Sequence, residues 1–107
     1  MQEKIKRVYV PMTETAFYIL FALQEERHGY DITQRTKTIT GGQVMISPGT
    51  MYGTLSKMEK DGLIVLVKEE DKRKFYRMTD VGREVLDTEL ARIERLYRNS
   101  KGDSYGK

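Results

Sequence analysis

The sequence predicts a mainly α-helical domain that carries one small β-hairpin. Three observations lead to this fold class. Apolar residues recur at helical spacing in the segments 47–62 and 79–98, and the segment 14–26 has a centre that is apolar on every side. Two β-prone runs lie on either side of a charged turn between residues 63 and 78. With 107 residues in all, the chain has room for one domain with a single modest core.

The composition excludes several classes of protein. Hydrophobic residues make up 38% of the chain and charged residues 33%, as in a soluble globular protein rather than a disordered one. No apolar run approaches the roughly 18 residues that span a membrane, and the N-terminus lacks a signal-peptide stretch. The absence of cysteine excludes disulfides and thiolate metal sites. We therefore expect a cytoplasmic protein with no membrane partner.

The N-terminal part predicts an arm followed by a buried helix. Residues 1–11 form the arm, which we expect to be disordered. Its basic side chains are Lys4, Lys6 and Arg7. Thr13 can cap a helix over 14–26 whose centre is apolar on every side, as in a helix that is buried all round. Because so short a chain has little mass to cover this helix, we expect one of its faces to meet a second copy of the chain.

A second helix and a short strand are predicted next. The helix follows a turn at 27–29, makes apolar contacts through Tyr30 and Ile32, and ends at Gly41–Gly42. Residues 43–46, with the sequence QVMI, are β-prone and predict a short strand.

The stretch SPGTMYGTLSKMEKDGLI, residues 47–64, predicts a helix with an unusual outer face. Ser47 is a good N-cap, Pro48 suits the first helical position, and Gly62 ends the helix. The inward stripe is Met51, Leu55 and Met58. The outward face is small, hydroxyl-bearing and basic, with no carboxylate as far as Lys57. Its residues are Gly49, Thr50, Gly53, Ser56, Lys57 and Lys60, with Tyr52 on the flank.

Such a face suits the major groove of DNA. A helix that enters the groove needs positions without bulk, donors for phosphates and a few long side chains for base edges. Gly49 and Gly53 lie one turn apart and would let DNA approach the backbone, although a glycine inside a helix costs roughly 1 kcal/mol. The same glycines would also permit tight packing against another protein helix, with the lysines merely solvated.

The hairpin has strands near 63–67 and 74–78. Its tip lacks Asn-Gly and Asp-Gly, so we expect a turn longer than two residues. Three basic residues gather there and would meet phosphates or the minor groove: Lys72, Arg73 and Lys74. Three acidic residues beside them would repel DNA unless they point away: Glu69, Glu70 and Asp71.

The last helix begins at Thr79 and carries an apolar seam. The seam residues, spaced 4, 3 and 4, are Leu86, Leu90, Ile93 and Tyr97. The order of elements predicts a winged helix-turn-helix with an N-terminal arm over 1–79, a long C-terminal dimerisation helix over 80–99, and a disordered tail over 100–107.

Three motifs in this order and spacing resemble the PadR-like transcriptional regulators: HGYDI, SPGTMYGTLSKMEKDGLI and RKFYRMTDVG. The resemblance covers about residues 14–97 and is to the smaller PadR subfamily, with one long C-terminal helix. It implies a winged-helix homodimer, a repressor that binds double-stranded DNA at an inverted repeat, and relief by a small planar or amphipathic effector. Two positions depart from the family pattern: Gly53 stands where proline is frequent, and Lys57 where arginine is frequent.

The residues and the resemblance together assign candidate roles. Those expected to bind DNA are Ser47, Gly49, Thr50, Tyr52, Gly53, Lys57, Lys72, Arg73, Lys74 and Tyr76. Those expected at the dimer interface are Phe17, Phe21, Leu86, Leu90, Ile93 and Tyr97. An effector cavity at that interface would be lined by Phe17, Phe21 and Tyr97, although aromatic residues at this spacing are more often plain core.

Nothing in the sequence indicates an enzyme. The lone histidine, His28, precedes the second helix, where capping or packing is more common than catalysis. SPGT lacks the lysine and the spacing of a phosphate-binding loop, and no cofactor is expected. A winged helix that binds only other proteins is the alternative, since the acidic residues of the hairpin tip are compatible with it.

Overall fold

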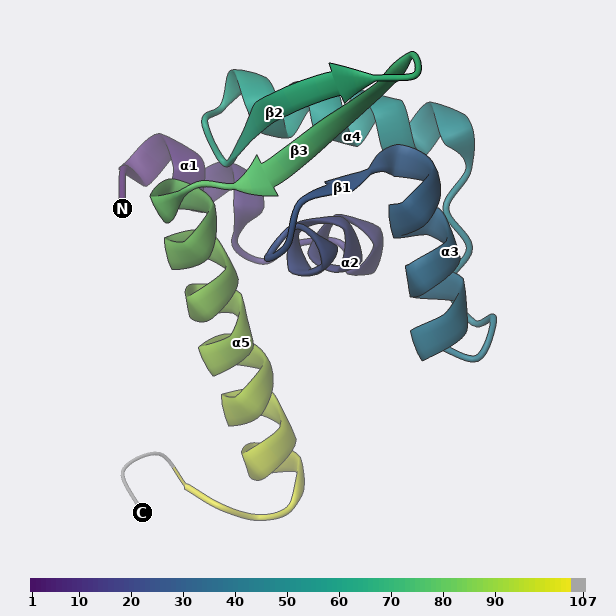
Figure 1. Ribbon diagram of the computed structural model, residues 1–107. Helices are drawn as coiled ribbons and strands as arrows, with labels where there is room; N and C mark the ends of the chain where they lie inside the picture. The colour runs from purple at the N-terminus through teal and green to yellow at the C-terminus, as the bar shows by residue number, and fades with distance from the viewer. Residues whose placement is uncertain (105–107) are drawn as a thin grey trace.

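The computed structural model describes residues 1–104 and contains five helices and three strands within that range (Figure 1). The elements, in chain order, are α1 (Glu3–Tyr9), α2 (Glu14–Ala22), β1 (Arg27–His28), α3 (Gly29–Ile39), α4 (Pro48–Lys60), β2 (Ile64–Glu70), β3 (Arg73–Met78) and α5 (Asp80–Ser100). Helices α2, α3 and α4 form the helical core, the small sheet lies beside α4, and α5 leads away from the domain (Figure 1).

The N-terminal arm is ordered, which corrects the expectation that it is disordered. It forms helix α1, and two of its residues, Ile5 and Tyr9, are buried in the core. Tyr9 donates a hydrogen bond of 2.7 Å to the Oδ2 atom of Asp61, just after α4. The arm was underestimated because two apolar residues in one short helix give almost no periodic signal, and their partners lie far along the chain.

Helices α2 to α4 begin close to where the sequence predicts, and α3 and α4 also end there, whereas α2 ends at Ala22, four residues before the predicted end at 26. The Thr13 and Ser47 side chains accept hydrogen bonds from backbone N–H groups of the first turns of α2 and α4. Helix α3 ends in front of Gly41 and Gly42, both of which have positive φ angles. The core expectation for α3 holds for Ile32, which is fully buried, and is wrong for Tyr30, which is 61% exposed.

The sheet is antiparallel with strand order β1-β3-β2. The predicted hairpin is present and is the wing of this fold. Its turn, however, has only two residues, because Glu70 pairs with Arg73. Asp71 and Lys72 have φ angles of 51° and 65°, which makes the left-handed turn that matches the twist of a hairpin without Asn-Gly or Asp-Gly.

The predicted strand at 43–46 is absent. This segment connects α3 to α4, and it contributes the buried side chain of Ile46 to the core. The third strand is instead β1, whose Arg27 and His28 pair with Tyr76 and Phe75 of β3. A strand of two residues has no alternation of its own and forms because a distant partner supplies the hydrogen bonds.

Helix α5 begins at the predicted cap, Thr79. Its first turn packs closely against Leu63, the residue just before β2. A Cβ atom at Gly82 would lie 2.2 Å from the carbonyl oxygen of Leu63, so only glycine fits there. The expected tail over 100–107 is partly corrected: Ser100 is helical, and the Asn99 side chain donates to the carbonyl of Asp103 at 2.7 Å. Residues 105–107 lie outside the described part.

Candidate nucleic-acid interface

One face of helix α4 packs into the core, and the opposite face is exposed. The predicted inward stripe is confirmed, since Met51, Leu55 and Met58 are at most 2% exposed. On the opposite face, Cβ atoms built at Gly49 and Gly53 would meet no atom within 4 Å. These glycines therefore do not serve packing against the chain's own helices. No side chain covers the backbone at these two positions, so a flat or convex partner can approach it closely there.

Tyr52 stands at the edge of this open face and is 59% exposed. Its ring lies across Gly29, at the start of α3, where a Cβ atom would be 3.2 Å from the Tyr52 Cε1 atom. Gly29 is buried beneath the ring. The first turn of α3 thus supports the tyrosine from below while the hydroxyl end remains available to a partner.

A hollow of about 410 Å³ separates α4 from the wing, and we call it the wing hollow. Its walls come from the start of α3, from α4 and from both wing strands; they include Tyr30, Tyr52, Ser56, Lys72, Arg73 and Lys74. Among the lining residues Glu69 is acidic. The cationic residues outnumber it, so the wing hollow favours an anion.

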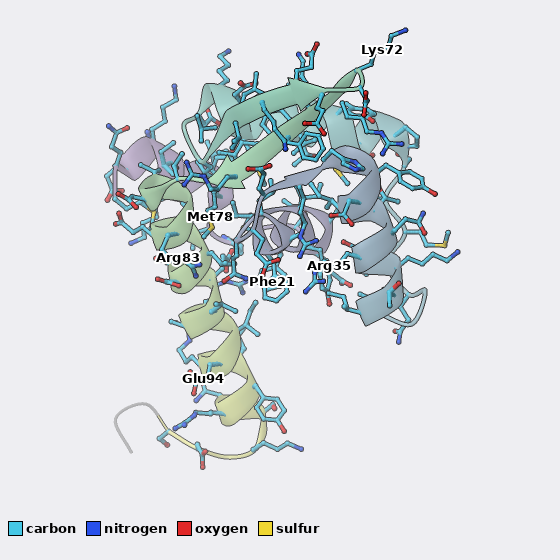
Figure 2. The ribbon with its side chains drawn as sticks, in the orientation of Figure 1. Phe21, Arg35, Lys72, Met78, Arg83 and Glu94 are labelled. Atoms are coloured by element: carbon cyan, nitrogen blue, oxygen red, sulfur yellow. The ribbon has the colours of Figure 1, made fainter. Side chains whose placement is uncertain are left out.

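The wing carries exposed charges of both signs. Lys72 occupies the tip of the turn and extends away from the domain (Figure 2). Lys68, on β2, has its Nζ atom 3.5 Å from Glu26 and 3.6 Å from Glu70. Of the three acidic residues at the tip, Glu70 is therefore partly neutralised within the wing.

Lys57 is held near the end of α4 by a small cluster. Its Nζ atom lies 3.7 Å from Asp61 Oδ2 and 5.4 Å from the centroid of the Tyr9 ring. Burial and the hydrogen bond to Asp61 hold the pKa of the Tyr9 hydroxyl well above the usual value for tyrosine. The hydroxyl therefore stays protonated and keeps donating to Asp61, while half-exposed Lys57 remains able to reach outward.

The residues predicted to bind DNA lie on two flanks of α4. The wing hollow is lined by Tyr52, Lys72, Arg73, Lys74 and Tyr76, whereas a hollow of about 400 Å³ on the α1 side is lined by Gly49, Thr50, Gly53 and Lys57. Ser47 and Thr50 lie at the start of α4 and are hydrogen-bonded to each other. Tyr76 differs from the expectation: it is only 7% exposed, so its ring supports the base of the wing instead of presenting a free surface. Burial raises the pKa of its hydroxyl, and the nearby carboxylates of Glu59 and Glu69 add to the rise.

Sequence reasoning missed two contributors to this surface. His28 caps α3 as expected, but its second ring nitrogen lies 3.4 Å from Arg73 on the wing. Tyr9 anchors α1 against the end of α4. Both contacts join residues 45 and 52 positions apart, so no local pattern could have revealed them.

The residues predicted for a dimer interface fall into two groups. Leu86 is fully buried in the chain's own core, which corrects its assignment to the interface. Leu90, Ile93 and Tyr97 are 40%, 41% and 62% exposed. On α2, the rings of Phe17 and Phe21 are half-buried and stack with centroids 5.8 Å apart, and Phe21 lies on the side of α2 away from the wing (Figure 2).

Another hollow, of about 360 Å³, lies between α2 and α5 and includes Phe17, Tyr18, Leu90 and Ile93. Of the predicted cavity residues, Phe17 lines it, whereas Phe21 and Tyr97 do not belong to its walls. Within residues 1–104, no three His, Asp or Glu side chains gather as a metal site would require. Over the same residues, no helix has both the length and the apolar character needed to cross a bilayer.

Comparison with known proteins agrees with this architecture. The model of the transcriptional regulator PadR-like family matches residues 19–88. The transcriptional regulator Rv3488 of Mycobacterium tuberculosis is 36% identical over 84 residues, which cover 76% of each chain. The transcriptional regulator YqjI of Escherichia coli is 26% identical over 83 residues, which cover 78% of this chain and 40% of that protein. The chain thus spans less than half the length of that relative.

Among solved structures, Bacillus subtilis PadR in complex with operator DNA is similar with a TM-score of 0.64 and 30% sequence identity. The match covers 75% of this chain and 48% of that one. From the family match and these relatives, the chain belongs to the PadR-like family of transcriptional regulators, which are transcription factors and not enzymes.

Proposed function

We propose that this protein is a repressor that binds an inverted-repeat operator in double-stranded DNA as a homodimer. The observation that carries the proposal is the open face of α4, where Gly49 and Gly53 have no neighbour within 4 Å of a built Cβ atom. A basic wing lies on the flank of α4 that carries Tyr52 and Ser56. The two features match the needs of a helix in the major groove and a hairpin on the adjacent backbone.

The solved relative in complex with operator DNA supports the same assignment. In this chain, α4 would enter the major groove and present Thr50, Tyr52, Ser56 and Lys57 to bases and phosphates. The wing would place Lys72 and its basic neighbours against phosphates. Since Lys57 replaces an arginine, the chain lacks the bidentate fork that reads guanine there, and we expect its operator to differ from those of arginine-bearing relatives.

Exposed apolar side chains on α5 support the homodimer. Leu90, Ile93, Leu96 and Tyr97 are 40–62% exposed on a helix whose second half stands clear of the domain (Figure 1). Isolated apolar residues on a surface are ordinary, but four of them on one helix form a patch that a partner would cover. The half-exposed rings of Phe17 and Phe21 on α2 would extend the interface.

The homodimer sets the geometry of the operator. Two α4 helices on one side of the DNA would read half-sites about one helical turn apart, or 34–36 Å, arranged as an inverted repeat. The hollow between α2 and α5 lies where the two subunits would meet, and it is mostly apolar, although its lining also includes Glu14, Glu89 and Arg92. A small planar or amphipathic effector bound there would change the arrangement of the two subunits and so release the DNA.

Selection of genomic fragments by the purified protein tests this proposal. Enrichment of fragments that share an inverted repeat is the expected result, and footprinting should then protect both half-sites. Full-affinity binding to one isolated half-site would contradict the dimeric mode. A protein-only winged helix, the competing function, would enrich no sequence.

Sedimentation measures the homodimer separately. The wild type should sediment as a dimer, and Ile93→Glu, which puts a charge at the centre of the α5 patch, should sediment as a monomer. Asp87→Glu, on the same helix and already exposed, is the matched control. A wild-type monomer at micromolar concentration would refute the interface.

A further inference from the structure

The ring of His28 is fixed in the wing hollow by three contacts. It meets the ring of Phe75 edge-on, with centroids 5.0 Å apart and planes at 88°. Its Nδ1 atom accepts a hydrogen bond from the backbone N–H of Asp31 at 3.3 Å, which caps α3. Its Nε2 atom lies 3.4 Å from the Nη1 atom of Arg73.

The contacts of the two ring nitrogens cannot both be hydrogen bonds. A neutral imidazole has one acceptor nitrogen and one N–H donor. Because Nδ1 accepts from Asp31, Nε2 is the nitrogen left to carry the proton, and it needs an acceptor. A guanidinium group has donors only, so the nitrogen that lies 3.4 Å from Nε2 cannot be that acceptor. The pair lacks an acceptor, and an anionic oxygen placed between them would satisfy both.

We propose that His28 and Arg73 form a seat for one phosphate of the DNA backbone. A non-bridging phosphate oxygen would accept from His28 Nε2 and from the Arg73 guanidinium at once. Lys72 and Lys74 line the same hollow and add attraction, whereas Glu69 opposes it. This inference rests on the proposed function, and it names the group of DNA that the wing hollow takes.

The position of the seat fits the path of a DNA strand. It lies between α4, which would occupy the major groove, and the wing, which would lie toward the minor groove. One sugar-phosphate strand separates these two grooves, and it would cross the wing hollow with Tyr52 on its α4 side. A phosphate contact carries no sequence information, so His28 and Arg73 set the register of α4 on the operator and do not read bases.

Two substitutions should remove the phosphate contact while leaving the fold intact. His28→Asn keeps the cap, because asparagine is a good N-cap acceptor, but it removes the nitrogen that faces Arg73. Arg73→Ala removes the partner at an exposed position where folding is not in question. Lys37→Ala, an exposed basic residue in the last turn of α3, is the matched control for loss of positive charge.

The test measures fluorescence anisotropy on a duplex obtained by genomic selection, in which single phosphates are replaced in turn by neutral methylphosphonates. We expect one phosphate per half-site whose neutralisation weakens wild-type binding by about tenfold, as for loss of hydrogen bonds to a charged group. The same neutralisation should cost Arg73→Ala and His28→Asn clearly less than the wild type, because each variant has already lost one of the two donors to that phosphate. Lys37→Ala should respond like the wild type.

Two outcomes would overturn the seat while leaving the function intact: His28→Asn binding as tightly as the wild type, or both variants losing as much affinity as the wild type at every neutralised phosphate. Failure of the wild type to bind any selected duplex would overturn the seat and the proposed function together.

Discussion

Replacing Gly53 by glutamine should stabilise the fold and weaken DNA binding. Gly53 lies in the middle of α4, and a Cβ atom there would meet nothing within 4 Å. The new side chain therefore enters solvent without displacing any neighbour. Because glycine is among the poorest helix formers and glutamine among the better ones, the helix gains about 0.5 kcal/mol. The melting temperature of a domain of this size should then rise by about 2–4 °C.

The same side chain would stand between α4 and the DNA. A helix that is lifted from the groove forgoes hydrogen bonds to base edges worth about 1–3 kcal/mol each, so the affinity should fall by about 10-fold to 100-fold. Glutamine carries no charge, so this loss cannot come from a change in electrostatic attraction. If one substitution raises the stability of the fold and lowers its affinity for DNA, the exposed face of α4 is kept free of side chains for a ligand.

The assay pairs thermal melting by circular dichroism with fluorescence anisotropy on a selected duplex. Thr38→Gln, at an exposed position of α3, is the control for an added glutamine away from the proposed interface. It should leave the affinity unchanged. If Gly53→Gln binds the duplex within twofold of the wild type, the open face of α4 does not meet DNA and the proposed orientation of the helix is wrong.

Three further substitutions probe the contacts that support the interface. Gly82→Ala puts a Cβ atom 2.2 Å from the Leu63 carbonyl and should lower the unfolding free energy by about 3 kcal/mol, measured by urea denaturation. Tyr9→Phe removes the donor to Asp61 and should lower it by about 1.5 kcal/mol at neutral pH. Since the raised pKa of Tyr9 means that the folded state holds its proton longer, wild-type stability should fall as pH rises above about 10, and Tyr9→Phe should lack this part of the loss. Ile93→Glu should abolish dimer sedimentation while the subunit keeps its helical circular-dichroism signal, because that side chain is 41% exposed; its melting temperature should fall only by what dimerisation contributes.

Helix α4 could be predicted from the sequence almost completely. Ser47 and Pro48 determine where it begins, and the spacing of Met51, Leu55 and Met58 determines which face is buried. These signals are local, so each residue can be interpreted from its neighbours. The open face followed directly, because the positions opposite a buried stripe must point away from the core.

The sequence could not predict features that depend on distant partners. Strand β1 exists because β3 pairs with it, and the Tyr9–Asp61 hydrogen bond exists because α1 folds back onto the end of α4. The two-residue turn at Asp71 was missed for a different reason. Asparagine and glycine are only the commonest residues in that conformation, and aspartate also tolerates a positive φ angle.

The central claim is that α4 and the wing bind DNA through both groove and backbone. Its most direct test is the salt dependence of anisotropy on a duplex from upstream of the protein's own gene or from genomic selection, beside a scrambled duplex of equal length. The variant with Lys72, Arg73 and Lys74 all changed to alanine is measured in parallel. We predict preference for the selected duplex and a slope of log affinity against log salt that shrinks in the variant by about 0.9 for each phosphate that the variant no longer neutralises. Equal, weak binding to both duplexes with the same slope for wild type and variant would contradict the claim.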